Sequence, residues 1–291
     1  MFPDNPSLIQ EGPQPKSQAA SPWSKPPTPL VLIHDGGGTV FSYYCLGELD
    51  RPVHGISNPN YDSGEPFPGG IQEMAKLYIK YIKNVVPRGN LMIGGWSLGG
   101  LLSLEVAWQL AQEEENNTGI NLLGIVMVDS VCPLSWKNGD AQRGILSVVR
   151  TGAAWGPNTK EETKRKVTKC FSESGRMVGE WEMPKWETEN GREIKPPPVI
   201  LLRAKDMVPV PGGEEGVVSR VDVCRGDRHL GWDAYRKGLI TKVVDIPGHH
   251  FNIFSDMDNL DVATEEIRRA CKELEGWHVR RFFSWGKEEG R

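Results

Sequence analysis

LMIGGWSLGGLLSL, from Leu91 to Leu104, joins an apolar run, a glycine-rich corner with Ser97 at its apex and a second apolar run without a break. This order predicts a strand, a sharp turn and a helix. Residues 95–99 match G-x-S-x-G, the pattern of a nucleophile elbow, in which glycines flank the serine because the tight turn leaves no room for side chains. Glycine and serine are also common in ordinary loops, so the flanking apolar runs are what favour the elbow. Ser97 is therefore predicted to stand exposed above a sheet.

The composition is that of a globular protein, with 38% hydrophobic and 25% charged residues among 291. A net charge of −4 gives no reason to expect a nucleic acid or a membrane surface as a partner. The chain has no signal-peptide pattern and no apolar run long enough to span a bilayer. Its five cysteines are widely spaced without a C-x-x-C pair, which predicts neither a disulfide framework nor a metal site. A reducing, cytoplasmic location is expected.

Apolar runs alternate with helical patterns along most of the chain. Runs that are apolar on both faces predict buried parallel strands. We expect strands at 29–34, 52–57, 91–95, 120–129, 198–203 and 241–246, and helices from about 39, at 71–82, 98–113 and 260–274. This alternation predicts an α/β fold with a mostly parallel sheet and helices on both of its faces.

The alternation defines the expected domain limits. Residues 1–28 are rich in Pro, Ser and Gln and predict a flexible leader. The main domain is expected over 29–275. Between about 133 and 197 the alternation lapses into charged stretches with scattered tryptophans, which we interpret as a helical lid inserted into the sheet order. Residues 276–291 form a tail whose role the sequence does not indicate.

A serine nucleophile needs a base within hydrogen-bond reach and a carboxylate that orients the base. In the elbow fold these follow in the order Ser, acid, His, at the carboxyl ends of later strands. Two acids occupy such positions, since Asp129 ends one predicted strand and Asp206 follows another. Two histidines, His249 and His250, come directly after the last strand. We interpret the remaining histidines as surface or capping residues: His34, His54, His229 and His278.

An oxyanion hole is the third requirement of this chemistry. The N–H of Leu98 lies at a helix N-terminus, where the helix dipole also favours negative charge. A second N–H is expected from the loop after the first strand, Asp35-Gly36-Gly37-Gly38. A glycine-rich loop is equally typical of a turn or a phosphate cradle. Because no G-x-G-x-x-G with a downstream acid accompanies it, a dinucleotide site is disfavoured.

Four segments together resemble a known family: IHDGGGT at 33–39, GGWSLGG at 94–100, MVDS at 127–130 and PGHHF at 247–251. They resemble the α/β-hydrolase thioesterases that release chains from polyketide and nonribosomal peptide synthases, particularly the fungal ones. The resemblance covers about 29–275. It implies an α/β-hydrolase fold and release of an acyl chain from a carrier-protein thioester, by hydrolysis or cyclisation, in secondary-metabolite biosynthesis.

The resemblance also implies roles for individual residues. Ser97 would be the nucleophile and His250 the base, with His249 a neighbour. The family's acid follows the strand after the elbow, which selects Asp129 over the alternative Asp206. Gly36 and Leu98 would supply the oxyanion N–H groups.

The family binds no cofactor, and its substrate is carried on the phosphopantetheine of an acyl carrier protein, which is the expected partner. We expect a free-standing enzyme acting in trans. Three tryptophans are candidates for the acyl-binding pocket: Trp96, Trp155 and Trp181. Equally, the two in the expected lid could pack the lid onto the core. Three other functions stay open: an ordinary carboxylesterase, an editing thioesterase that clears misloaded carriers, and a non-catalytic binding protein on a hydrolase fold.

Overall fold

The computed structural model of this chain describes residues 4–13, 26–113, 119–137, 145–146, 158–187, 191–210 and 217–285. Its centre is a seven-stranded sheet in the order β1-β3-β2-β4-β5-β7-β9. The strands are β1 (Ser7–Gln10), β2 (Leu30–Ile33), β3 (Val53–Ile56), β4 (Gly89–Trp96), β5 (Ile120–Val128), β7 (Val199–Ala204) and β9 (Ile240–Ile246). All neighbouring pairs are parallel except β1 with β3. The predicted mostly parallel sheet is confirmed.

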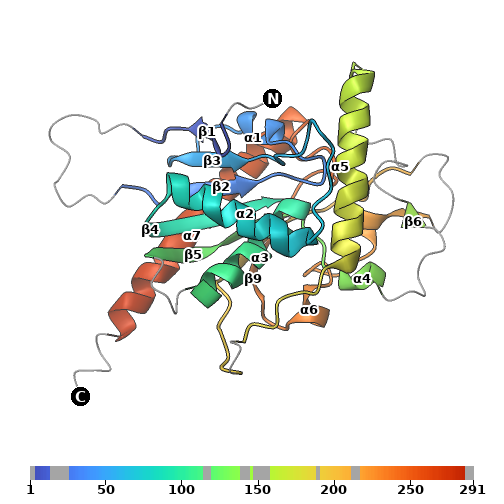
Figure 1. Cartoon of the computed structure of the whole chain (residues 1–291). Helices are drawn as coiled ribbons and strands as arrows, with labels where there is room; N and C mark the ends of the chain where they lie inside the picture. The colour runs from blue at the N-terminus through green and yellow to red at the C-terminus, as the bar shows by residue number, and fades with distance from the viewer. Residues whose placement is uncertain are drawn as a thin grey trace.

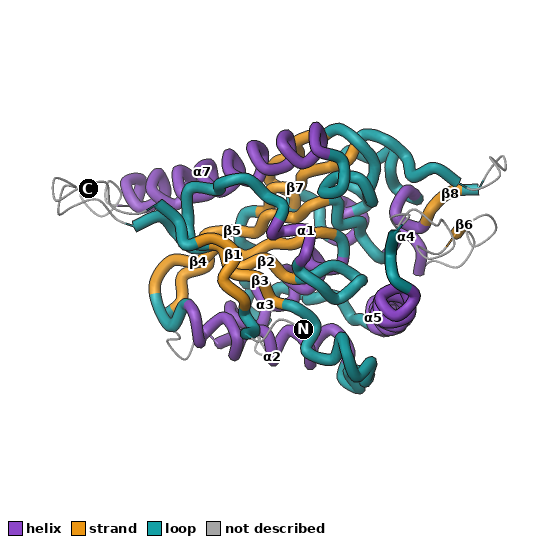
Figure 2. The backbone as a smooth tube through the Cα atoms, turned by 90° about the horizontal axis from the view of Figure 1, so that it is seen from above, coloured by secondary structure: helices purple, strands orange, loops and turns teal. Residues whose placement is uncertain are grey.

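Helices cover both faces of the sheet. The helices are α1 (Phe41–Tyr44), α2 (Gly70–Val85), α3 (Leu98–Glu113), α4 (Leu134–Lys137), α5 (Glu161–Glu180), α6 (Trp232–Tyr235) and α7 (Met257–Trp285). In the view from above, α2 and α3 lie on one side of the sheet and α7 on the other (Figure 2). A second, two-stranded sheet pairs β6 (Ile145–Leu146) with β8 (Val218–Ser219).

Alternating side chains of the buried strands build two cores. In β2, Val31 and Ile33 pack into the cluster that contains α2 and α3, whereas Leu30 and Leu32 pack into the cluster that contains α7. Side chains alternate in this way because successive residues of a strand point to opposite faces. Each fully buried aliphatic side chain contributes about 1.5–3 kcal/mol of transfer free energy. A strand apolar on both faces is therefore the expected signature of the middle of this sheet.

The helix predicted at 71–82 is confirmed as α2, which carries an apolar stripe. All six residues of the stripe are buried: Ile71, Met74, Ala75, Tyr78, Ile79 and Ile82. Its solvent side carries Lys76, Lys80 and Lys83. The spacing of three and four residues places the apolar set on one face, which lies on the sheet.

The strand β1 and the end of helix α7 lie outside the expected limits of the domain. Within the segment predicted to be a flexible leader, Ser7–Gln10 forms the edge strand β1, paired antiparallel with β3. At the other end, α7 continues to Trp285, well past the expected end of the domain at residue 275. The pattern of 1–28 is dominated by turn-forming residues, and so short a strand is stabilised by its pairing with β3 rather than by its own composition.

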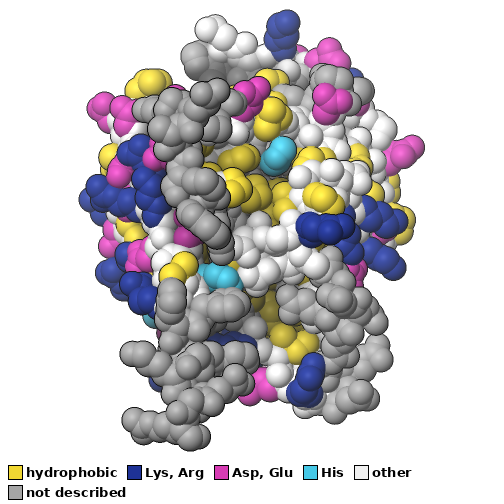
Figure 3. Space-filling view, turned by 90° about the vertical axis from the view of Figure 1, so that its left-hand side faces the viewer, with side chains coloured by type: hydrophobic (Ala, Val, Ile, Leu, Met, Phe, Trp, Pro, Cys, Tyr) yellow, Lys and Arg dark blue, Asp and Glu magenta, His cyan; other side chains and the backbone are white. Residues whose placement is uncertain are grey.

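The strand order predicts a crevice at the carboxyl ends of the central strands. From β2 the sheet grows in one direction to β3 and in the other to β4. Ligands of parallel α/β sheets bind outside the carboxyl ends of the strands at such a reversal. The helix α5, within the segment expected to form a lid, stands across this edge (Figure 1). Figure 3 shows the opposite end of the molecule, where the strands begin, with Lys and Arg side chains gathered at its flanks.

Candidate active site

Ser97 occupies a tight turn between β4 and α3. Its backbone φ is +56°, a left-handed value that is uncommon for a residue with a side chain. A Cβ on Gly95 would lie 2.5 Å from the carbonyl oxygen of Ile33, and one on Gly99 would lie 2.3 Å from the same oxygen. Both glycines are therefore required by the close approach of β2. The local geometry is that of the predicted elbow.

The doubled glycine after the serine has its own explanation. A Cβ on Gly100 would lie 2.1 Å from Oγ of Ser130, which follows β5. Ser130 is held in place, since its carbonyl oxygen accepts a hydrogen bond from Nε1 of Trp232 at 2.8 Å. The start of α3 thus packs directly against the loop that carries Asp129.

Ser97, His250 and Asp129 form a continuous hydrogen-bonded chain. Nε2 of His250 lies 3.1 Å from Oγ of Ser97, and Nδ1 of His250 lies 2.8 Å from Oδ2 of Asp129. An ionised carboxylate only accepts, so Nδ1 carries a proton and Nε2 is left to accept from the serine hydroxyl. The three residues come from the carboxyl ends of β4, β5 and β9. This is the arrangement in which a histidine can remove a proton from serine.

Asp129 is held by several donors besides His250. Its Oδ1 accepts from the N–H of Ala204 at 3.0 Å, and both oxygens accept from the guanidinium of Arg225, at 2.5 and 2.8 Å. Arg225 also pairs with Asp222 at 2.9 Å. Burial alone would raise the pKa of Asp129, but the hydrogen bonds from Arg225 and His250 outweigh it and lower the pKa to about 2. Asp129 is therefore ionised at neutral pH.

The alternative acid and the alternative base lie elsewhere. The side chain of Asp206 is exposed, and its backbone N–H bonds to the carbonyl of Gly248. The N–H of His249 donates to Oδ1 of Asn252, and its ring Nδ1 accepts from the N–H of Phe251. The structure brings together Asp129 and His250, not Asp206 and His249.

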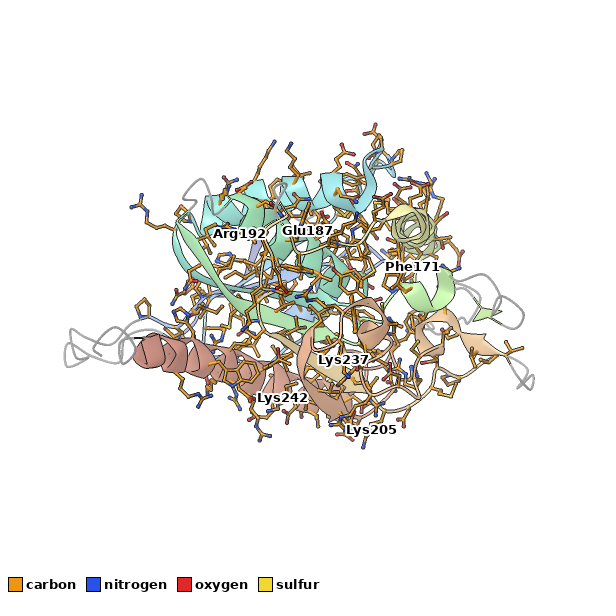
Figure 4. The ribbon with its side chains drawn as sticks, turned by 90° about the horizontal axis from the view of Figure 1, so that it is seen from below. Phe171, Glu187, Arg192, Lys205, Lys237 and Lys242 are labelled. Carbon is orange, nitrogen blue, oxygen red and sulfur yellow. The ribbon has the colours of Figure 1, made fainter. Side chains whose placement is uncertain are left out.

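A cavity of about 530 Å³ opens beside Ser97. Gly36 and Leu98, the two residues predicted to supply oxyanion N–H groups, both line it. Leu98 is the first residue of α3, where an N–H has no partner within the helix. A Cβ on Gly36 would lie 3.0 Å from the ring of Phe171 on α5, so glycine lets this helix come close to the loop. Figure 4 looks nearly along α5 and labels Phe171 on it.

The interpretation of His34 as a surface or capping residue is wrong. His34 is buried; its Nδ1–H donates to the carbonyl of Asp35, and its Nε2 accepts from the hydroxyl of Tyr78, both at 2.6 Å. Burial lowers the pKa of His34 to about 4. The side chain is therefore neutral at neutral pH, and its two hydrogen bonds connect the start of the glycine loop to α2. Burial likewise raises the pKa of its neighbour Asp35, to about 7.

Two of the three candidate pocket tryptophans, Trp96 and Trp181, do not line the cavity. Trp181 is buried in the core, where its Nε1 donates to Oε2 of Glu105 at 2.9 Å. Trp96 packs beside the ring of His250, with centroids 5.3 Å apart. Trp155 lies outside the described residues. Among the described residues, the phenylalanines of the cavity wall are Phe171 and Phe251. Phe171 belongs to a helical stripe with Thr168, Gly175 and Val178, a spacing that could have indicated it.

Within the described ranges, no group of His, Cys, Asp and Glu is arranged to hold a metal ion. A search of the same residues finds no helix that is both long and apolar enough to cross a bilayer.

A mostly parallel sheet, a serine elbow after β4, and an acid and a histidine after later strands define an α/β-hydrolase fold. The "Thioesterase domain" family model matches residues 28–150. A probable thioesterase, gloN, of Glarea lozoyensis is 34% identical, over 93% of this chain and 98% of its own length. Thioesterase frbE of a Dothideomycetidae species is 35% identical, over 93% and 96%. This chain belongs to the thioesterase family of hydrolases.

A solved structure supports the same assignment. The NocB thioesterase domain, crystallised as a covalent complex with a fluorophosphonate nocardicin G analog, superposes with a TM-score of 0.59 at 26% identity. The match covers 84% of this chain and 94% of that one. The fold and family expected from the four sequence segments are confirmed.

Proposed function

We propose that this protein is a serine thioesterase that releases a polyketide- or peptide-type acyl chain from a carrier protein through an acyl-Ser97 intermediate. The observation that carries the proposal is the hydrogen-bonded chain from Ser97 through His250 to Asp129, opening onto a cavity lined by Gly36 and Leu98. The NocB domain, which is known in a covalent complex with a fluorophosphonate, belongs to the same family. A covalent step at the corresponding centre is consistent with that complex.

In the first half-reaction Nε2 of His250 takes the hydroxyl proton of Ser97, and Oγ attacks the thioester carbonyl. The N–H groups of Gly36 and Leu98 stabilise the resulting oxyanion, and the α3 dipole adds to this effect. Asp129 stays ionised and stabilises the imidazolium. Collapse of the tetrahedral intermediate breaks the C–S bond, and His250 returns its proton to the departing thiolate. The products are the acyl-serine ester and the phosphopantetheine thiol.

In the second half-reaction His250 deprotonates a nucleophile that attacks the ester, and then protonates Oγ of Ser97 as it leaves. Water as the nucleophile gives a free acid, and a hydroxyl or amine of the same chain gives a ring. The helix α5 forms the wall of the cavity opposite the elbow and is the part of the proposed lid that would exclude bulk water. Exclusion of water lowers the local dielectric constant, which strengthens the electrostatic contribution of the oxyanion N–H groups.

Intact-protein mass spectrometry with acyl-pantetheine thioesters tests the covalent step. The wild-type chain should gain the acyl mass during turnover, and Ser97→Ala should not, with turnover lower by at least about 10³-fold. Normal turnover by Ser97→Ala would reject the mechanism. A simple oxyester that is turned over while carrier-type thioesters are not would indicate an ordinary carboxylesterase instead.

The proposed acid is tested by a matched pair of substitutions. Asp129→Asn should lower kcat by about 10⁴-fold, because an amide cannot hold the imidazole in the required tautomer or stabilise its cation. Asp206→Asn, on an exposed side chain, should leave kcat within about twofold. The reverse result would transfer the role to Asp206.

A further inference from the structure

One cation of the cavity wall has no part in the proposed chemistry. Arg220 opens the short 3₁₀ helix Arg220–Asp222 and lines the same cavity as Ser97 and His250. Its Nη1 lies 3.7 Å from the position that a Cβ on Gly175 would take, so the guanidinium lies against α5 at a residue without a side chain. Arg220 thus lies on the cavity wall at the place where the 3₁₀ helix meets α5.

Arg220 differs from the nearby Arg225 in its partners. Arg225 is fully engaged with Asp129 and Asp222. Arg220 is half-buried and, among the residues that the structure describes, has neither an ion pair nor a hydrogen bond. A half-buried guanidinium carries a desolvation cost that an anion can offset. The lysines Lys205, Lys237 and Lys242 lie away from α5 (Figure 4), so they are not part of this wall.

Apart from the catalytic centre, apolar side chains and hydroxyl groups make up much of the cavity wall. Leu101, Val178 and Phe251 line its interior, and Thr168 and Ser172 present hydroxyls from α5. Two carboxyls also line the cavity, and neither pairs with Arg220: burial raises the pKa of Asp35 to about 7, and Asp129 is already paired with Arg225 and His250. Such a cavity suits an acyl chain that is apolar along its length and carries an oxygen-rich or anionic group at its far end.

We infer that Arg220 is a specificity-determining residue that pairs with a carboxylate carried on the acyl chain, away from the thioester carbonyl. The inference rests on the proposed thioesterase function. The same cation could pair with the phosphate of the phosphopantetheine arm. A cavity of about 530 Å³ that also contains Ser97 favours the acyl carboxylate, because two amide units of the arm separate the phosphate from the sulfur that reacts there.

The test compares two pantetheine thioesters of equal length, adipoyl with a free carboxylate and adipamoyl with a neutral amide. Wild type should prefer the carboxylate in kcat/KM by about ten- to a hundredfold, the ratio expected for a hydrogen bond between charged groups. Arg220→Met should lose this preference while its kcat/KM for the amide stays within about threefold. Arg220→Lys, which keeps the charge without the planar fork, should retain an intermediate preference.

Three results would overturn the inference. Equal turnover of the two thioesters by wild type removes the role of Arg220 in acyl specificity and leaves the proposed function intact. If Arg220→Met instead slows only substrates on 4′-phosphopantetheine, and not those on pantetheine, the arm phosphate is the partner and the acyl carboxylate is rejected. Failure of wild type to turn over either thioester, with no acyl mass on the protein, would reject the proposed function as well.

Discussion

Two buried arginine–carboxylate groups lie at opposite ends of the sheet. At the carboxyl ends of the strands, Arg225 is 6% exposed and pairs with Asp129 and Asp222, both of which are fully buried. At the amino ends, Arg51 is 1% exposed and pairs at 3.0 Å with Glu275, which is 29% exposed. The two arginines also bond to backbone carbonyls, those of Ala204 and Thr28 respectively.

The difference lies in what each carboxylate does besides binding its arginine. Asp129 also accepts from His250, so the Arg225 group determines the orientation of the imidazole. Glu275 instead accepts from the backbone N–H of Thr28, which joins α7 to the start of β2 across 247 positions of the chain. An arginine–carboxylate pair thus supports the proposed catalytic histidine as well as the fold at one end of the sheet, and the fold alone at the other.

Replacing each arginine with methionine gives the largest expected contrast. Arg225→Met leaves two buried carboxylates without their cation and should lower the free energy of unfolding by about 3–5 kcal/mol. Because Asp129 is then free to shift relative to His250, kcat/KM should fall by about 10²-fold. Arg51→Met should cost about 1–3 kcal/mol, since Glu275 reaches solvent, and should leave kcat/KM within twofold.

Urea unfolding and steady-state kinetics at a temperature where both variants are folded check this contrast. Loss of activity in Arg51→Met without a matching loss of folded protein would contradict the division of roles. So would full activity in Arg225→Met.

Glu275→Gln gives a smaller effect at the amino end. The amide oxygen can still accept from Thr28, and only the charge opposite Arg51 is removed. The free energy of unfolding should fall by about 1–2 kcal/mol, and kcat should not change. Glu273→Gln, on an exposed pair with Lys242, is the matched control and should change stability by less than about 1 kcal/mol. Equal losses in the two variants would show that burial of the Arg51 pair is not what stabilises it.

Asp35→Asn tests a partly buried carboxyl with which no described cation pairs. Burial raises the pKa of Asp35 from 3.8 to about 7, opposite to the shift of Asp129. Between these values the folded chain keeps a proton that the unfolded chain has released, so stability falls as the pH rises from about 4 to about 7. The asparagine variant lacks this slope and should gain about 1 kcal/mol or more over wild type by pH 8.

The measurement is the difference in unfolding free energy between wild type and Asp35→Asn across this pH range. His34, whose pKa is lowered from 6.5 to about 4, makes stability rise with pH over much of the same range. Because His34 is present in both proteins, its contribution cancels in the difference. A difference that does not vary with pH would show that Asp35 is ionised throughout.

Local pattern was enough to predict the elbow, the strand and helix order, and the two acids and two histidines that follow later strands. Each of these depends on a few neighbouring residues or on the rule that parallel strands end at a common edge. The choice of Asp129 and His250 among the acids and histidines came from the family resemblance. Arg225 could not be predicted in this way, because it lies 96 positions from Asp129 and no spacing links them.

The other features that the sequence did not predict also depend on contacts with distant parts of the chain. His34 looks like any polar residue after a strand, and its burial depends on Tyr78, which arrives from α2. Tryptophans within the expected lid suggested an aromatic chamber, whereas Trp181 packs into the core against Glu105. The edge strand β1 exists because β3 offers unpaired backbone groups, and composition does not report such a partner.

The contact between Gly100 and Ser130 limits how this protein can be recombined with its relatives. A side chain at position 100 would displace Ser130, the residue next to Asp129, because a Cβ at this position would lie only 2.1 Å from Oγ of Ser130. We therefore expect that a chimera which imports segment 94–100 or 127–130 with a larger residue at this contact needs the matching segment from the same parent.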